Sequence, residues 1–305
     1  MIGKICGTGS SIPVKIMDND DLSNMVDTND AWIRERTGVE KRHIAESEST
    51  VSMAVEAGRQ ALAQTGVRPE ELDMIVVSTM SPDAVLPCTA CEVQKAIGAE
   101  GAVCFDLQAA CTGFIFAYNT AQAYIQSNMC RTVLLIGSER LSRLVDWTDR
   151  GTCILFGDGA GAAVLKAAEG RAYLPVSHSD GKKGEALTCN RYIHMDGRAV
   201  FQFAVTRVPE VIREVLTKNE LLMDDIDYFV LHQANRRIVE AVAKRLGQPI
   251  EKFPMNLQEY GNTSSASIPI LLDEMNRSGK LKKGQKLVVA GFGAGLSWGA
   301  SIVEW

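Results

Sequence analysis

The chain has 305 residues, of which 46% are hydrophobic and 23% charged, so it can bury one large core or two halves that share one. Its net charge of -5 and its pI of about 5.5 argue against nucleic acid as a partner, because phosphate binding needs a clustered basic field. No apolar run has the length of a signal peptide or a membrane span, which predicts a cytosolic protein without a membrane partner.

The predicted elements alternate between helices and buried strands. Residues 51–66 (VSMAVEAGRQALAQTG) have apolar positions at helical spacing and end in a glycine, which predicts a helix. Residues 71–79 (ELDMIVVST) predict a buried strand, and a further apolar strand ends at residues 167–170 (AAEG). This alternation predicts an α/β fold with buried sheets, and no Pro/Ser-rich linker divides it.

The second half of the chain repeats the first. Residues 67–82 (VRPEELDMIVVSTMSP) resemble residues 220–235 (ELLMDDIDYFVLHQAN). When Leu72-Asp73 is aligned with Ile226-Asp227, Tyr228 stands 154 residues after Met74. The segments RTVLLIG and QKLVVAG are similar at the same offset, and GAAVL is echoed by GASIV near the end. We therefore predict two halves, 1–170 and 171–305, forming a pseudo-twofold pair of sheets around central helices, with the active site where the halves meet.

Three separated polar residues fall at the ends of predicted elements. Cys111 in CFDLQAACTGF begins a predicted helix, whose N-terminus would stabilise a thiolate and lower the pKa of the thiol. His232 ends the strand in FVLHQANRRI, and Asn262 in EYGNTSSASIP precedes a helical run. In the duplicated frame the residues after Asn262 occupy the counterpart of the Cys111 helix start, so we expect all three residues to converge.

Each of these residues taken singly has an ordinary structural explanation. A cysteine packs as a small hydrophobe, a histidine that ends a strand can be a satisfied core imidazole, and Asn-Thr-Ser can cap a helix. The order Cys, His, Asn also occurs in papain-like hydrolases, but their Cys-Gly-x-Cys-Trp run is absent here. A non-catalytic binding paralogue is opposed by the presence of all three residues.

The remaining cysteines and histidines show no ligand pattern. Cys88 and Cys91 form a CxxC without a second pair or a thioredoxin-like context, so we expect reduced thiols and no function there. His43, His178 and His194 have no ligand spacing, and we predict no metal.

The segments DLQAACTGF, HQANRRI, GNTSSASIP, FGDGAGAAVL and GFGAGLSWGAS resemble the motifs of the β-ketoacyl-[acyl carrier protein] synthase III family over essentially the whole chain. The resemblance implies a thiolase-like fold with α-β-α-β-α layers and a catalytic triad of Cys111, His232 and Asn262. It further implies an acyltransferase that needs no cofactor. Cys111 would take an acyl group from acyl-CoA, typically acetyl-CoA, and condense it with malonyl-[acyl carrier protein], releasing CO2 and CoA and giving a 3-oxoacyl-[acyl carrier protein]. Priming of another pathway, such as polyketide synthesis, and acyl transfer without decarboxylation stay open, and the sequence does not fix the primer.

The family match also assigns roles to other residues. The backbone N–H groups of Cys111 and Ala294 would form the oxyanion hole. The CoA-binding residues would be Thr28, Trp32, Arg36, Arg150 and Asn235. The acyl carrier protein would meet a patch of Gln233, Ala234, Arg236, Arg237, Lys244 and Arg245.

The match implies a homodimer, in which Leu86 of the other subunit closes the acyl pocket. Two departures bear on carrier binding: Gln202 stands where a lysine is common, and the loop between residues 190 and 192 is shorter than in many members.

Overall fold

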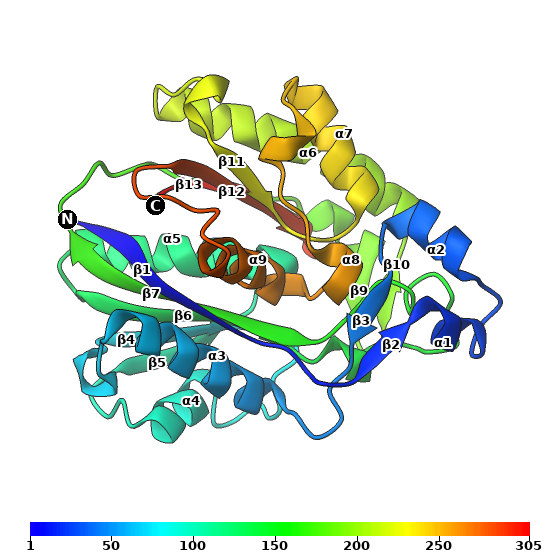
Figure 1. The fold of residues 1–305 in the computed structure, drawn as a ribbon, viewed down its shortest axis with the longest axis horizontal. Coiled ribbons are helices and arrows are strands. Elements are labelled where there is room, and N and C mark those ends of the chain that lie inside the picture. The colour runs from blue at the N-terminus through cyan, green and yellow to red at the C-terminus, as the bar shows by residue number, and fades with distance from the viewer.

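The computed structural model describes residues 1–305 and shows five layers (Figure 1). Helices α5 (Gly113–Gln126) and α9 (Ser267–Arg277) lie in the central layer between two sheets. Helices α3 (Thr50–Thr65) and α4 (Thr89–Ile97) cover the outer face of the first sheet. The outer face of the second sheet is covered by α6 (Gly197–Lys218) and α7 (Arg236–Leu246). The predicted α-β-α-β-α layering is confirmed.

The two sheets share the order and directions of four strands, and the first sheet has a fifth strand, β5, at its edge. The first sheet runs β1-β7-β6-β4-β5, and the second runs β8-β13-β12-β11. Strand β4 pairs in parallel with β6 as β11 does with β12. Strand β7 pairs antiparallel with both of its neighbours, β6 and β1, as β13 does with β12 and β8. The edge strand β5 pairs in parallel with β4. The strands of the first sheet are β1 (Ile2–Ser11), β4 (Met74–Ser78), β5 (Val103–Leu107), β6 (Thr132–Glu139) and β7 (Gly159–Ala168). Those of the second are β8 (Val176–Ser179), β11 (Tyr228–Leu231), β12 (Lys286–Gly293) and β13 (Ser297–Glu304).

Local sequence explains the element boundaries. The predicted helix at residues 51–66 is α3, which begins after the Ser49 cap and ends at Gly66 with φ +66°. The predicted strand at residues 71–79 contains β4, in which every residue is buried, as expected for a strand covered on both faces.

A cluster of 22 buried residues joins the halves, because side chains of α5 such as Phe114 pack with side chains of α9 such as Leu271. Because residues of both halves belong to this cluster, the two halves share one core. Burial of each such side chain contributes about 1.5–3 kcal/mol to the free energy of folding.

Shorter elements gather on one side of the layers, to the right in Figure 1. They are α1 (Asn19–Ser23), α2 (Asp30–Thr37), α8 (Leu257–Tyr260) and the strand pairs β2 (Ile16–Asp18) with β3 (Lys41–His43) and β9 (Leu187–Cys189) with β10 (Ile193–Met195). The β9–β10 hairpin includes the loop that the sequence predicts to be short. All eight cysteines are free thiols, and none of the helices has both the length and the apolar character needed to cross a bilayer.

Candidate active site

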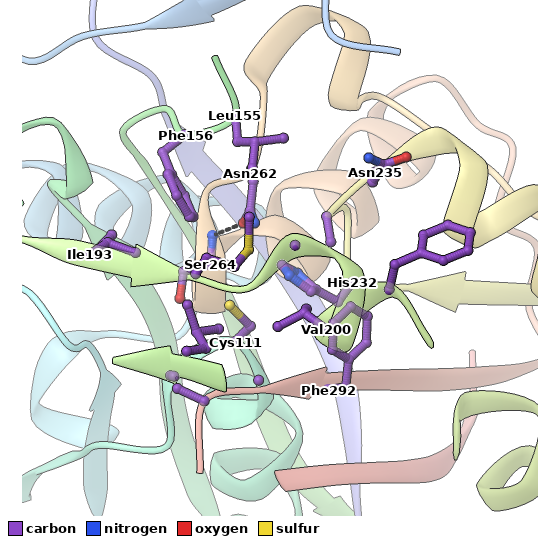
Figure 2. Close-up of a pocket in the computed structure, with 18 of the residues that line it drawn as sticks. Cys111, Leu155, Phe156, Ile193, Val200, His232, Asn235, Asn262, Ser264 and Phe292 are labelled. Atoms are coloured by element: carbon purple, nitrogen blue, oxygen red, sulfur yellow. Dashed lines mark hydrogen bonds between the residues drawn. The ribbon is translucent and has the colours of Figure 1, made fainter. Parts of the chain in front are cut away.

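A cavity of about 440 Å³ lies where the two halves meet, and Cys111, His232 and Asn262 all line it (Figure 2). Its wall is mainly apolar and includes Leu155 and Phe156 from the first half and Phe292 from the second. The predicted convergence of the three residues is therefore present. The β9–β10 hairpin contributes further wall residues, which no motif in the sequence indicates.

Cys111 lies in a 3₁₀ turn, Ala110–Thr112, that runs directly into α5. The preceding residue, Ala110, has φ +46°, an unusual value for a residue with a side chain. Strand β12 approaches this turn so closely that a Cβ added to Gly293 would lie 2.8 Å from the backbone nitrogen of Cys111. Glycine is therefore required at position 293, and the neighbouring Ala294 lines the same cavity.

The charge state of the thiol differs from the prediction. Cys111 is 8% exposed, and burial raises the pKa of its thiol to about 12, against a smaller lowering by the Ser264 hydroxyl. No cationic side chain offsets the loss of hydration. The expected lowering of the pKa by the helix N-terminus is wrong, because desolvation outweighs it and the group is a neutral thiol at neutral pH.

His232 follows the last residue of β11 and is 3% exposed. Its Nδ1 lies 2.7 Å from the Oγ of Ser267, the first residue of α9, so that Nε2 is the ring nitrogen without a protein partner. Burial lowers the pKa of the imidazole to about 3. The ring is therefore neutral at neutral pH and carries a single N–H.

Asn262 is held by backbone and side-chain bonds together. Its backbone N–H donates to the carbonyl of Leu155 at 2.8 Å, and its carbonyl accepts from the N–H of Gly157 at 3.1 Å. Its side-chain Oδ1 accepts from the N–H of Ser264 at 2.9 Å, as drawn in Figure 2. The amide Nδ2 therefore has both of its hydrogens available as donors.

Three residues beside the triad were missed by sequence reasoning: Ser264, Ser267 and Glu139. Glu139 is fully buried at the end of β6, where its carboxyl group accepts from Ser81 Oγ at 2.6 Å and contacts Ser265 Oγ at 2.8 Å. Burial raises the pKa of this carboxyl group. The duplicated frame could have indicated Ser267, which stands 154 residues after Gly113, but nothing in the sequence indicates Glu139.

The residues predicted to bind CoA lie around the cavity and beside it. Arg36 and Asn235 line the cavity, and Asn235 Nδ2 donates to the carbonyl of Arg36 at 3.0 Å. Two guanidinium groups lie over the ring of Trp32, that of Arg150 at 4.8 Å and that of Arg36 at 6.0 Å from the ring centroid. The hydroxyl of Thr28 is buried and has no hydrogen-bond partner.

The predicted carrier patch is exposed only in part. The side chains of Arg236, Arg237 and Lys244 are exposed on α7. Arg245 is also exposed, but its Nη1 donates to the carbonyl of Val205 at 2.6 Å.

Gln233 corrects the prediction. It is buried, and its side chain bonds to the carbonyl of Leu231 and to the N–H of Asn256, so it anchors the loop and offers no surface contact. Ala234 is half-buried and lines the cavity. Gln202 is exposed on α6, whereas Leu86 is 82% exposed and does not line the cavity of its own chain, so its role in a partner subunit stays a prediction.

The duplicated sheets around paired central helices are the thiolase fold of condensing enzymes. Residues 105–181 match the family model for 3-oxoacyl-[acyl-carrier-protein] synthase III, and residues 216–305 match the model for its C-terminal part. A protein of Clostridium acetobutylicum named β-ketoacyl-[acyl-carrier-protein] synthase III is 46% identical, over 99% of this chain and 98% of its own. The chain belongs to the β-ketoacyl-[acyl-carrier-protein] synthase III family.

Solved structures agree with this assignment. The crystal structure of 3-oxoacyl-[acyl-carrier-protein] synthase III from Aquifex aeolicus superimposes with a TM-score of 0.97 at 43% identity, covering 99% of this chain and all of the other. The priming β-ketosynthase of the R1128 polyketide pathway superimposes with a TM-score of 0.96 at 36% identity, covering 99% and 96%. The papain-like alternative is wrong, because the fold and family are those of an acyl-transferring condensing enzyme.

Proposed function

We propose that this protein catalyses the initiating condensation of fatty acid synthesis. An acyl group from acyl-CoA, acetyl-CoA in the simplest case, would pass to Cys111 and then to malonyl-[acyl carrier protein]. The observation that carries the proposal is the convergence in one apolar cavity of a thiol and two nitrogens without protein acceptors, His232 Nε2 and Asn262 Nδ2. A hydrolase would need an activated water, which the mainly apolar wall of this cavity disfavours.

In the first half-reaction the sulfur of Cys111 would attack the thioester carbonyl of acyl-CoA. The new C–S bond replaces the bond to CoA, and the thiol proton leaves with CoA as its free thiol. Backbone N–H groups of Cys111 and Ala294 would hold the oxyanion, since strand β12 brings Gly293 and Ala294 against the turn that carries the nucleophile.

In the second half-reaction malonyl-[acyl carrier protein] would lose CO2 and leave an enolate. The two N–H donors at His232 and Asn262 would stabilise the negative charge that develops on the thioester oxygen. The enolate carbon would attack the acyl group on Cys111, giving a 3-oxoacyl-[acyl carrier protein], and the released thiolate takes up one proton. The buried, neutral imidazole suits this role, because it donates without adding a charge that would have to be desolvated.

The surfaces proposed to bind CoA and the carrier protein lie at the cavity and on α7. The adenine of CoA would stack on Trp32 after Arg150 moves aside, with Arg36, Thr28 and Asn235 along the same route. An acidic carrier protein would meet Arg236, Arg237 and Lys244 on α7. The proposal includes a homodimer, in which Leu86 enters the partner's pocket. It also includes a cytosolic location and the absence of a cofactor or metal. Light scattering of the purified protein tests the homodimer.

The test is incubation with acetyl-CoA and malonyl-[acyl carrier protein], followed by intact-mass analysis of enzyme and carrier. We expect an acetyl group on Cys111 and acetoacetyl-carrier as the product. Acetyl-enzyme without condensation would refute malonyl-carrier as the second substrate. If neither acetyl-CoA nor longer or branched acyl-CoA acylates the enzyme, the proposal fails.

A second candidate is the priming of a polyketide pathway, favoured by the similarity to the R1128 ketosynthase. The chemistry would be the same, and the carrier would differ. Parallel assays with malonyl groups on a fatty-acid carrier and on a polyketide carrier separate the two functions.

A further inference from the structure

We propose that Ser267 is a positioning residue that fixes the tautomer of His232, by donating its hydroxyl hydrogen to Nδ1 so that the ring proton resides on Nε2. The catalytic consequence rests on the proposed function, but the tautomer itself does not.

The direction of the hydrogen bond follows from the partners of Ser267 Oγ. These are His232 Nδ1 at 2.7 Å and the backbone N–H of Gln233 at 3.3 Å. The N–H of Gln233 can only donate, so it uses a lone pair of the hydroxyl oxygen. Ser267 is 2% exposed, and the one acceptor within reach of its hydrogen is Nδ1.

The opposite arrangement would leave a polar hydrogen buried. If Nδ1 carried the proton and donated to Ser267 Oγ, that oxygen would accept two bonds and its own hydrogen would have no acceptor. An unsatisfied buried donor costs about 1–3 kcal/mol. The arrangement in which Ser267 donates satisfies Nδ1, the Ser267 hydroxyl and the N–H of Gln233. It places the single proton of the neutral ring on Nε2, the nitrogen left free for a ligand in the cavity that His232 lines.

The duplicated frame shows that this pair is not a requirement of the fold. The positions 154 residues earlier are Gly113 in place of Ser267 and Ser78 in place of His232. A Cβ at Gly113 would lie 1.9 Å from Ser78 Oγ, and that hydroxyl has no hydrogen-bond partner. The same backbone junction therefore forms without a side-chain bond in one half. The bond between His232 and Ser267 is confined to the half that supplies the donors to the cavity.

The tautomer decides which half-reaction depends on Ser267. With the proton on Nε2, His232 presents an N–H to the thioester oxygen on which charge develops during decarboxylation. With the proton on Nδ1, it would present a lone pair and repel that charge. Acyl transfer to Cys111 uses backbone N–H groups in our scheme, so it does not depend on the tautomer.

The first test is nitrogen NMR of the native enzyme labelled with ¹⁵N-histidine. The chain has four histidines, and the spectrum of His232→Gln identifies the signals of His232 by their absence. At pH 7 we expect Nδ1 to resonate as an unprotonated ring nitrogen and Nε2 as a protonated one. Ser267→Thr should keep this pattern. A protonated Nδ1 in the native enzyme would overturn the inference.

The second test separates the two half-reactions. In Ser267→Ala we expect acetylation of Cys111 within about twofold of native, while kcat for condensation falls at least about tenfold with little change in KM for malonyl-carrier. Ser267→Thr should recover most of the rate. Ser301→Ala is the matched control, because it removes an equally buried serine hydroxyl, which donates to Asn119 Oδ1 at 2.6 Å outside the cavity.

The outcomes distinguish positioning from a merely structural role. Equal losses in acetylation and condensation, or a similar loss in Ser301→Ala, would assign Ser267 to stability and overturn the inference. If Ser267→Ala does not fold, the ¹⁵N spectra of the native enzyme and of Ser267→Thr still show which ring nitrogen of His232 carries the proton. A native enzyme with the Nε2–H tautomer that fails to condense any substrate would refute the proposed function while leaving the tautomer assignment standing.

Discussion

The starts of α5 and α9 place different side chains on the same backbone. Each helix follows a 3₁₀ turn whose first residue has a positive φ, +46° at Ala110 and +50° at Ser264. The next residue is Cys111 in the first half and Ser265 in the second, 154 positions later. Cys111 lines the cavity, whereas Ser265 does not and contacts the carbonyl of Ser78 and the carboxyl group of Glu139.

This difference teaches how a duplicated fold acquires one active site. The backbone turn is common to both halves, so it cannot be the source of the chemistry. One copy carries Cys111, the proposed nucleophile, and the other carries Ser265, which contacts the strand ends of the first copy at Ser78 and Glu139. Substitutions in the two copies should therefore affect different steps of the reaction.

The largest effect is expected from Cys111→Ser, since a hydroxyl is a far weaker nucleophile than a thiol. Acetyl transfer from acetyl-CoA should fall by about 10⁴-fold, measured by intact mass over time. Adding Ser265→Cys to this variant should not restore it, because position 265 does not line the cavity. Cys6→Ser, at an exposed thiol, is the control. Acetylation of the double variant at position 265 would show that the two helix starts are interchangeable.

The next effect is expected from His232→Ala, which removes a donor without touching the nucleophile. Condensation should fall by about 10²–10³-fold, while acetylation of Cys111 continues. Product formation from malonyl-carrier and acetylation from acetyl-CoA are followed in the same samples. Normal condensation by this variant would remove His232 from the proposed site.

The next effect in size is a loss of folding stability at low pH, caused by the buried imidazole of His232. His232 has a pKa of about 3 in the folded protein and about 6.5 when unfolded. Below pH 6.5 the unfolded chain therefore binds a proton that the folded chain excludes, and stability is lost as the pH falls from 6.5 towards 3. Between pH 7.5 and 5 the loss due to His232 should be about 2 kcal/mol. Urea unfolding should show a shallower pH dependence for His232→Gln, but not for His194→Gln at an exposed site.

The smallest effect of a substitution is expected at Ser264, whose hydroxyl lowers the pKa of the Cys111 thiol. Because burial raises the pKa of Cys111 to about 12, its alkylation by iodoacetamide should quicken about tenfold per unit from pH 7 to 9. Ser264→Ala removes the hydroxyl that lowers this pKa, so alkylation at a fixed pH should slow by a few fold. Peptide mass spectrometry gives the rate at each cysteine. A rate independent of pH over this range would indicate a preformed thiolate.

Much of the arrangement could be predicted from the sequence because the duplication is visible there. The offset of 154 residues relates β4 to β11, at whose end His232 lies, and β6 to β12. The same offset relates the turn after Asn262 to the turn that carries Cys111. Hydrophobic runs and glycine caps located α3 and β4. The family motifs then supplied the roles that spacing could not.

The remainder depends on three-dimensional burial, which a motif does not report. The pKa of Cys111 was predicted in the wrong direction because the helix N-terminus is visible in the sequence and the apolar wall around the sulfur is not. The family match assigned Gln233 to the carrier patch, yet its side chain is buried. Glu139 and Ser267 form their hydrogen bonds with partners 126 and 35 residues away in the chain, so no local pattern indicates them.

The backbone pairing of Asn262 with the segment from Leu155 to Gly157 has a consequence for how these loops can diverge. The bonds involve only main-chain atoms, so side chains on either loop can be exchanged without moving the amide, except at Gly157 and Gly261, where a Cβ would clash with the carbonyl of the facing loop. An inserted or deleted residue would instead shift the register of the pairing and displace Asn262 from the cavity. The two loops should therefore vary in composition among functional relatives while keeping their lengths fixed relative to each other.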